Sequence, residues 1–183
     1  MVSRERLVEV FGEDTVLLPA EAVPEELRRQ PAGQTLMHTG LPRNLLDAIS
    51  SVPGLEEGVK TYGEHCEEVG IESDERIRAT YRIGFAGTGD ILVEPGSGDV
   101  YYAVPEADII RRINTSVDKY VEALCTLESE RERFDFLDEE DVAIQREELS
   151  DVLRESDEVT WDAASSFWRW IIEQISADDY RVF

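Results

Sequence analysis

Four short hydrophobic runs, separated by turns rich in glycine, form the clearest pattern along the chain. They cover residues 81–85, 91–93, 100–104 and 109–113. β-Branched and aromatic side chains are frequent in the runs, and glycine, proline and aspartate fill the connections, which is typical of strands joined by turns. Parallel strands need long crossover connections, so the short connections predict an antiparallel meander.

A pattern with helical spacing begins directly after the meander. Its apolar positions are Val117, Tyr120, Val121, Leu124 and Leu127. Either Thr115 or Ser116 can cap this helix, because a hydroxyl oxygen can accept a hydrogen bond from the free N–H groups of the first turn. We expect the helix to pack across one face of the sheet.

Two further helices are predicted near the end of the chain. Asp138 can cap the first, which carries Val142, Leu149 and Leu153 at helical spacing, and Thr160 can cap the second. The second has a continuous apolar stripe made of Trp161, Ala164, Phe167, Trp168, Ile171, Ile172 and Ile175. A stripe this amphipathic must be buried against another element.

The segment before the meander predicts several short helices. One is capped by Ser3 and ended by Gly12, one starts at Pro24, and one covers residues 31–39. We also expect residues 44–49 to be helical.

Residues 56–78 are polar and contain three glycines. We interpret this segment as a surface insertion without a defined helix or strand, in which His65 and Cys66 lie in a solvated loop. A chain of 183 residues has the length of one domain. We therefore expect residues 1–183 to form a single domain.

The chain is strongly acidic. It has 41 acidic and 18 basic residues, which gives a formal net charge of -23. Such a surface repels nucleic acid and anionic membranes and attracts basic partners. The sequence has no apolar run near the length of a membrane span and no signal-peptide core at its start, and its two cysteines make no disulfide framework. We therefore expect a cytoplasmic protein, with Cys125 as a small core residue.

Much of the excess charge lies in an acidic helical segment, residues 128–160. Between Glu128 and Asp162 there are 15 acidic and 4 basic residues. A run of charge is usually a solvated face of a helix. The alternative for the run Asp138, Glu139, Glu140 and Asp141 is contact with a basic partner.

Five short sequence motifs, in this order along the chain, resemble the SUKH superfamily. They are residues 36–42 (LMHTGLP), 81–84 (YRIG), 91–101 (ILVEPGSGDVY), 112–120 (RINTSVDKY) and 167–175 (FWRWIIEQI). The likeness is strongest to the bacterial immunity-protein branch that is common in actinobacteria. It covers most of the chain but leaves out residues 56–78.

The resemblance implies a fold and a function. The fold is α+β, with a mostly antiparallel sheet and helices packed against it. The function is that of an immunity protein, which binds and silences the catalytic domain of a cognate polymorphic toxin, often a nuclease or a nucleic-acid deaminase. Together with the charge, this predicts toxin-binding residues among Asp90, Glu94, Asp99 and the run from Asp138 to Asp141, facing a basic surface.

Catalytic chemistry has little support in the sequence. Residues 84–89 (GFAGTG) lack the glycine order of a dinucleotide fingerprint and the lysine of a P-loop, so we expect a connection between strands. His38, His65 and Cys66 are too few for a convincing metal site. Ser97 lies in a predicted turn, with no reason to meet a histidine. We therefore expect no catalytic residue, no metal and no cofactor.

Two other functions stay open from the residues alone. One is binding of a small ligand, with regulatory consequences, in a pocket under the meander. The other is mimicry of nucleic acid, in which the acidic face binds a DNA-binding protein in place of DNA. The partner distinguishes mimicry from toxin immunity, because both depend on the same electrostatic attraction.

Overall fold

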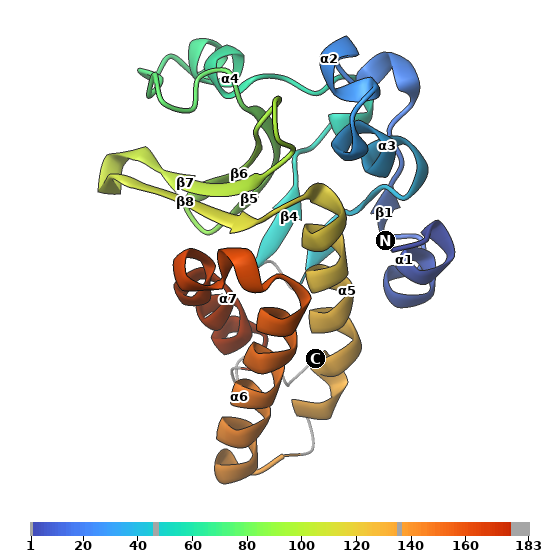
Figure 1. Ribbon diagram of the computed structural model, residues 1–183, viewed down its shortest axis with the longest axis vertical. Coiled ribbons are helices and arrows are strands. Elements are labelled where there is room, and N and C mark those ends of the chain that lie inside the picture. Colours follow the sequence, from blue (N-terminus) through green and yellow to red (C-terminus); the bar gives the residue numbers. More distant parts are fainter. Residues whose placement is uncertain (1, 46–47, 135–136, 177–183) are drawn as a thin grey trace.

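Six antiparallel strands form the central sheet of the protein (Figure 1). The computed structural model describes residues 2–45, 48–134 and 137–176. The strands are β3 (Asn44–Leu45), β4 (Ile49–Ser51), β5 (Tyr81–Ala86), β6 (Gly89–Val93), β7 (Val100–Val104) and β8 (Ile109–Asn114). They lie in the sheet in the same order as in the chain, so the predicted meander and the α+β class are confirmed.

Two glycines in the meander are required by its geometry. Gly84 lies at a shift in register between β5 and β6, and a Cβ there would be 2.7 Å from the carbonyl oxygen of Ser50 in β4. Gly87 has a φ of 55° in the short connection from β5 to β6, a conformation that favours glycine. The glycine-rich segment is therefore a β-hairpin, as the sequence predicts for a connection between strands.

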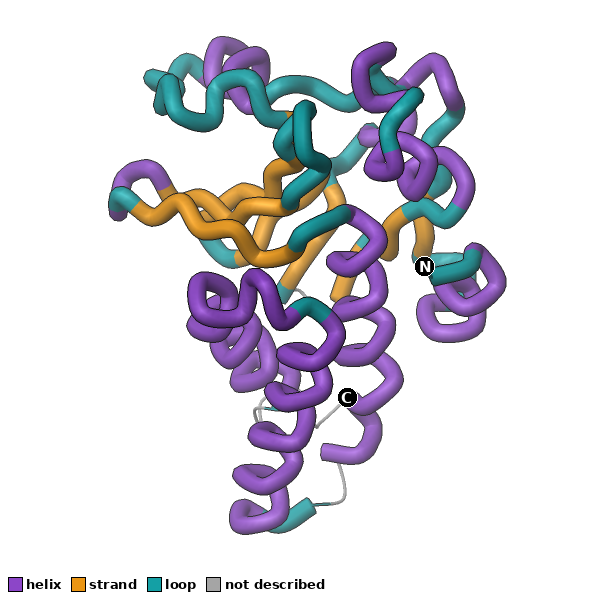
Figure 2. Tube along the Cα trace, viewed as in Figure 1, coloured by secondary structure: helices purple, strands orange, loops and turns teal. Residues whose placement is uncertain are grey.

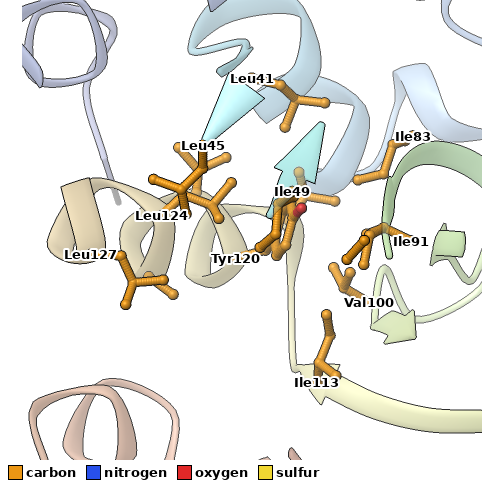
Figure 3. Close-up of a cluster of buried hydrophobic side chains, with 14 of the residues drawn as sticks. Leu41, Leu45, Ile49, Ile83, Ile91, Val100, Ile113, Tyr120, Leu124 and Leu127 are labelled. Carbon is orange, nitrogen blue, oxygen red and sulfur yellow. The ribbon is translucent and has the colours of Figure 1, made fainter. Parts of the chain in front are cut away.

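Three long helices lie on one face of the sheet: α5 (Val117–Phe134), α6 (Glu139–Ser156) and α7 (Trp161–Ile175) (Figure 1). Helices α5 and α7 contact strand β8, and α6 packs against both of these helices. Their buried side chains and those of the strands form one large hydrophobic cluster, the lower core. Figure 3 labels part of it: Leu41, Leu45, Ile49, Ile83, Ile91, Val100, Ile113, Tyr120, Leu124 and Leu127. The helix predicted after the meander packs as expected.

The stripe of α7 is buried, as its amphipathic pattern predicts. The ring of Phe167 lies 4.8 Å from that of Tyr102 in β7, measured between centroids. The indole Nε1 of Trp168 donates a hydrogen bond of 3.2 Å to the carbonyl oxygen of Ile113 in β8. Thr160, the predicted cap, ends a short 3-10 turn (Glu158–Thr160) immediately before α7. These contacts fix the last helix under the outer strands.

A buried aspartate joins the helical layer to the sheet. Asp157, at the end of α6, accepts hydrogen bonds from the side-chain amide of Asn114 and from both the backbone N–H and the hydroxyl of Thr115. The hydroxyl of Ser116 instead accepts from the backbone N–H of Lys119 in the first turn of α5. Of the two predicted caps of α5, Ser116 is therefore the cap, and Thr115 belongs to the Asp157 junction.

The opposite face of the sheet carries a shorter helix, α4 (Tyr62–Val69). A capping box starts it: the backbone N–H of Glu64 donates to the hydroxyl of Thr61, and Glu64 in turn accepts from the backbone N–H of Thr61. Figure 2 shows that loops make up much of this side of the molecule, whereas the other side is almost entirely helix.

A small hydrophobic cluster, the upper core, lies under α4. It consists of Tyr62, Cys66, Ile77, Leu92 and Ala103, with Tyr101 and Ile110 packed against it. Our prediction that residues 56–78 lack a defined element is therefore wrong, as is the placement of Cys66 in a solvated loop. A tyrosine and a cysteine form the apolar face of α4, so the sequence shows no repeat of aliphatic residues there.

The N-terminal segment packs beside these layers. Its elements are α1 (Arg4–Phe11), β1 (Thr15–Val16), α2 (Glu25–Arg28), α3 (Pro31–His38) and β2 (Leu41–Pro42). As predicted, Ser3 caps α1 by accepting a hydrogen bond from the backbone N–H of Arg6, and Gly12 follows its last residue. Pro24 precedes α2 and Pro31 is the first residue of α3, which also agrees with the sequence.

The prediction of a helix over residues 44–49 is wrong. Asn44 and Leu45 form β3, and Ile49 begins β4, which pairs with β3. Strand β4 also pairs with β5 through Ser50 and Phe85. Pairing with a strand much later in the chain overrides the local preference. Residues 46–47 of that prediction lie outside the described residues.

Candidate functional site

The fold places the predicted toxin-binding residues in two separate regions. Asp90, Glu94 and Asp99 lie in the meander. The run from Asp138 to Asp141 lies at the start of α6, at the end of the helical layer that is far from the sheet (Figure 1). One compact partner surface could therefore contact both groups only by extending along the length of the helices.

The three residues in the meander have partners inside the protein. Asp90 forms an ion pair with Arg82 of β5, and the two side chains are only 17% and 16% exposed. Asp99 forms an ion pair with Arg112 of β8 at 3.1 Å. The carboxylate of Glu94 accepts a hydrogen bond from the backbone N–H of Ser97 in the turn between β6 and β7. These carboxylates therefore stabilise the hairpins, whatever else they contact.

The acidic residues of α6 are more available. Asp138 caps the helix and accepts hydrogen bonds from the backbone N–H groups of Glu140 and Asp141, at 3.1 and 3.0 Å. Glu139, Glu140 and Asp141 form the exposed first turn. Their negative charge is favourable there because a helix N-terminus carries a partial positive charge.

A hollow that no sequence pattern indicates lies beside α4, and we call it the hairpin hollow. It has a volume of about 260 Å³ and lies between α4, the β5–β6 hairpin and the connection from β7 to β8. Its lining residues are Tyr62, His65, Ile71, Arg82, Phe85, Gly87, Thr88, Gly89, Asp90, Pro105 and Glu106. Three separate parts of the chain therefore meet there, which is why no local motif indicates it.

A larger groove adjoins the hairpin hollow, and we call it the α4 groove. It has a volume of about 590 Å³ and is lined mainly by residues of the 52–60 segment and by one side of α4. His65 and Arg82 line both the groove and the hollow. These two side chains therefore form the boundary between the two cavities.

Arg82 and His65 interact with charged and aromatic side chains at this boundary. The guanidinium of Arg82 donates from Nε to Asp90, and its Cζ lies 5.8 Å from the centre of the Phe85 ring. Burial and then the positive charge of Arg82 lower the pKa of His65, while Asp90 and Glu68 oppose this shift. His65 is therefore neutral at pH 7, and its imidazole adds no positive charge beside Arg82.

The outer wall of the hollow exposes apolar side chains. Gly70, with a φ of 73°, ends α4, and the backbone N–H of Ile71 then donates to the carbonyl oxygen of Cys66. After this helix ending, the side chain of Ile71 lines the hollow and is still 48% exposed. The side chain of Val69, at the end of α4, is 54% exposed. Exposed aliphatic side chains contribute to an interaction site where they form a contiguous patch, and here they lie beside a concave surface.

The fold does not bring the candidate metal-ligating and nucleophilic residues together into a site among the described residues. Among the described residues no group of three or more potential ligands could hold a metal ion. His38 lies on α3, with Nε2 3.1 Å from Gln34. Burial raises the pKa of Cys66, which opposes formation of a reactive thiolate. The hydroxyl of Ser97 accepts a hydrogen bond from the backbone N–H of Asp99 within its turn.

The sequence matches the family model described as SUKH-4 immunity protein, from residue 2 to residue 174. The chain belongs to the SUKH-4 immunity protein family. The resemblance to the SUKH superfamily is thus confirmed, and SUKH-4 membership supports an immunity role. Comparisons with curated proteins and with solved structures found no match.

SUKH-4 membership implies a protein partner, namely a cognate toxin. No helix in the described part of this SUKH-4 chain is both long and apolar enough to cross a membrane. Among the described residues, the hairpin hollow with its apolar wall and the acidic start of α6 are two surfaces with features suited to a protein partner.

Proposed function

We propose that this chain is an immunity protein that binds a cognate polymorphic toxin and neutralises it by covering a basic surface of the toxin's catalytic domain. The toxin is a nuclease or a nucleic-acid deaminase, because enzymes that handle nucleic acid carry basic surfaces. The chain acts in the cytoplasm, and it contributes no catalytic residue, metal or cofactor.

Family membership is the observation that carries this proposal. The charge supports it, because a net charge of -23 creates a field that attracts a basic partner. Such complementary fields speed association by about 10- to 1,000-fold at low salt. An inhibitor that must reach the toxin before it damages the cell benefits directly from rapid association.

Within this proposal, the predicted contact residues have different roles. Asp90, Glu94 and Asp99 are held in the meander, so they contribute a fixed negative potential near the hairpins. Glu139, Glu140 and Asp141 are exposed on the first turn of α6 and are free to steer the encounter. Steering by exposed charges changes the association rate more than the dissociation rate.

Co-expression with the toxin domain encoded by the neighbouring gene tests the proposal. We expect cells to survive only when the chain is present, and a tagged chain to retain the toxin in a pull-down. Survival without physical association would exclude the occlusion mechanism. Retention of a DNA-binding regulator in place of a toxin would favour mimicry of nucleic acid.

The same pair of proteins allows a measurement of salt dependence. Raising the ionic strength from about 0.01 M to 0.15 M shortens the Debye length from about 30 Å to 8 Å. We expect the association rate to fall steeply over this range, as exposed charges become screened. An association rate that does not change with salt would instead indicate that apolar contacts govern the encounter.

The α4 groove supports one alternative, the binding of a small ligand. Its volume of about 590 Å³ lies within the range of about 300–1,000 Å³ that is typical of such sites. Several polar side chains line it, including Lys60, Glu64 and His65. A metabolite that raises the melting temperature of the purified chain, and no longer does so after substitution of Lys60, would favour this function.

A further inference from the structure

The hairpin hollow has the dimensions and the chemistry of a socket for one long basic side chain. We propose that it receives a lysine or arginine of the toxin, which makes it the main anchoring point of the complex. This inference rests on the proposed function and adds to it the docking surface and the residue type that the toxin presents.

The volume of the hollow limits the occupant. At about 260 Å³ it lies below the range of about 300–1,000 Å³ that is typical of small-molecule sites. A single extended side chain is a better match than a metabolite. Interfaces often gain most of their affinity from one or two such anchors, with arginine and aromatic residues favoured.

The charge of the hollow selects a cation. Only Oδ1 of Asp90 bonds to Arg82, and Oδ2 of the same carboxylate accepts no hydrogen bond from the described residues. Glu106 is exposed and forms no ion pair with the described residues. His65 is neutral because its pKa is lowered. Two carboxylates therefore face one arginine, which leaves a negative charge for a basic side chain to neutralise.

The walls of the hollow suit the aliphatic part of that side chain. Ile71, Phe85 and Pro105 line it from three sides, and the ring of Tyr62 contributes from α4. Lysine and arginine bury their methylene groups along apolar surface while the charged end stays near polar groups. Val69 and the exposed part of Ile71 extend this apolar surface toward the partner. Asp90 and Glu106 place polar groups beside these apolar walls, and interfaces commonly combine an apolar centre with polar edges.

The outer face of α6 offers a comparison within the same chain. It also exposes two aliphatic side chains, Ile144 and Val152, between acidic residues. The substitution Glu140→Lys changes the net charge of the chain as much as Glu106→Lys does. The pair Glu106→Lys and Glu140→Lys therefore separates a local effect of the hollow from the effect of total charge.

The experiment measures association and dissociation rates of the full chain with the toxin domain, by surface plasmon resonance. We expect Glu106→Lys and Ile71→Ser each to raise the dissociation rate by about tenfold or more, as loss of an anchor does. Glu140→Lys and Ile144→Ser are expected to leave the dissociation rate within about twofold, with a slower association for the charge variant alone. Thermal unfolding measures whether each variant is folded. We expect all four to fold, because all four positions are exposed.

The dissociation rates decide whether the hollow is the anchoring point. Unchanged dissociation for Glu106→Lys and Ile71→Ser, with tight binding by the wild-type chain, overturns the docking surface and leaves the proposed function intact. Slower dissociation for Glu106→Lys means that the hollow receives an acidic group, which also overturns the inference. A faster dissociation for the α6 variants alone places the anchor on α6 instead. No binding by the wild-type chain removes the proposed function and this inference together.

Discussion

The two faces of the sheet are built differently. The lower face is covered by three long helices, and its core is a single large cluster that includes side chains from every strand of the main sheet. The upper face is covered by one eight-residue helix, α4, and its core has five fully buried members. One cysteine lies in each core, Cys125 below and Cys66 above.

This difference separates the part of the molecule with the larger core from the part that carries the proposed docking surface. The lower core holds most of the buried hydrophobic side chains, and burial of apolar surface is the main favourable term in folding. The upper face leaves cavities, exposed aliphatic side chains and paired charges near α4. Regions with few buried apolar contacts open at a lower free energy, and binding surfaces are frequently found in such regions.

Two adjacent residues of β6 allow a direct comparison of the cores. Ile91 points into the lower core and Leu92 into the upper core, and both are fully buried. We expect Ile91→Ala to lower the free energy of unfolding by about 4 kcal/mol and Leu92→Ala by about 2 kcal/mol. The small cluster under α4 can collapse around the lost atoms more easily than the large one. Urea denaturation measures both values, and equal losses would contradict the comparison.

The cysteines report on local opening of each core. Burial raises the pKa of both thiols, for Cys125 to about 11, so each reacts slowly with an alkylating reagent until its core opens. We expect Cys66 to be modified faster than Cys125, because the upper core opens at lower cost.

The capping box of α4 sharpens this measurement. Thr61→Ala removes the cap and costs about 1 kcal/mol, which corresponds to about fivefold faster modification of Cys66. The rate at Cys125 should not change, because Cys125 lies in α5, on the face of the sheet opposite to α4. Mass spectrometry resolves the two sites. If both rates rise together, the two cores open as one unit and the comparison fails.

The smallest predicted effect is a pH dependence that originates on the upper face. The pKa of His65 is lowered by burial and by Arg82, with Lys60 acting in the same direction and Asp90 and Glu68 against it. The neutral form therefore stabilises the fold above the unfolded pKa of about 6.5, and this contribution is lost as the pH falls through the lower folded pKa.

Unfolding of the wild-type chain and of His65→Gln at about pH 7.5 and at about pH 6 tests this sign. We expect the wild-type chain to lose more stability than the variant between these two pH values. A wild-type chain that gains stability relative to His65→Gln on acidification would show that Asp90 and Glu68 dominate at His65.

Much of the lower layer could be predicted from the sequence. The strands of the meander and the stripe of α7 follow regular patterns, because each buries one continuous face. The strands at residues 44–45 and 49–51 could not be predicted in this way, since their pairing partner β5 lies far along the chain. Helix α4 did carry a signal, the capping box Thr61–Glu64 followed by Gly70 at the helix end.

The candidate site was harder to predict for the same reason. The sequence identifies Asp90 and Asp99 as candidate contact residues, but their ion pairs with Arg82 and Arg112 depend on strand register, which a sequence alone does not specify. The hairpin hollow combines side chains from three separate segments. Only the folded chain brings Ile71 and Glu106 together.

A titration of toxin activity with the purified chain tests the central claim most directly. If the chain acts by covering a basic surface, toxin activity falls in proportion to the chain added, reaches its minimum at a stoichiometric ratio, and returns when high salt dissociates the complex. Inactivation by a small fraction of an equivalent, which persists after the chain is removed, would mean that the chain alters the toxin chemically and would contradict the account.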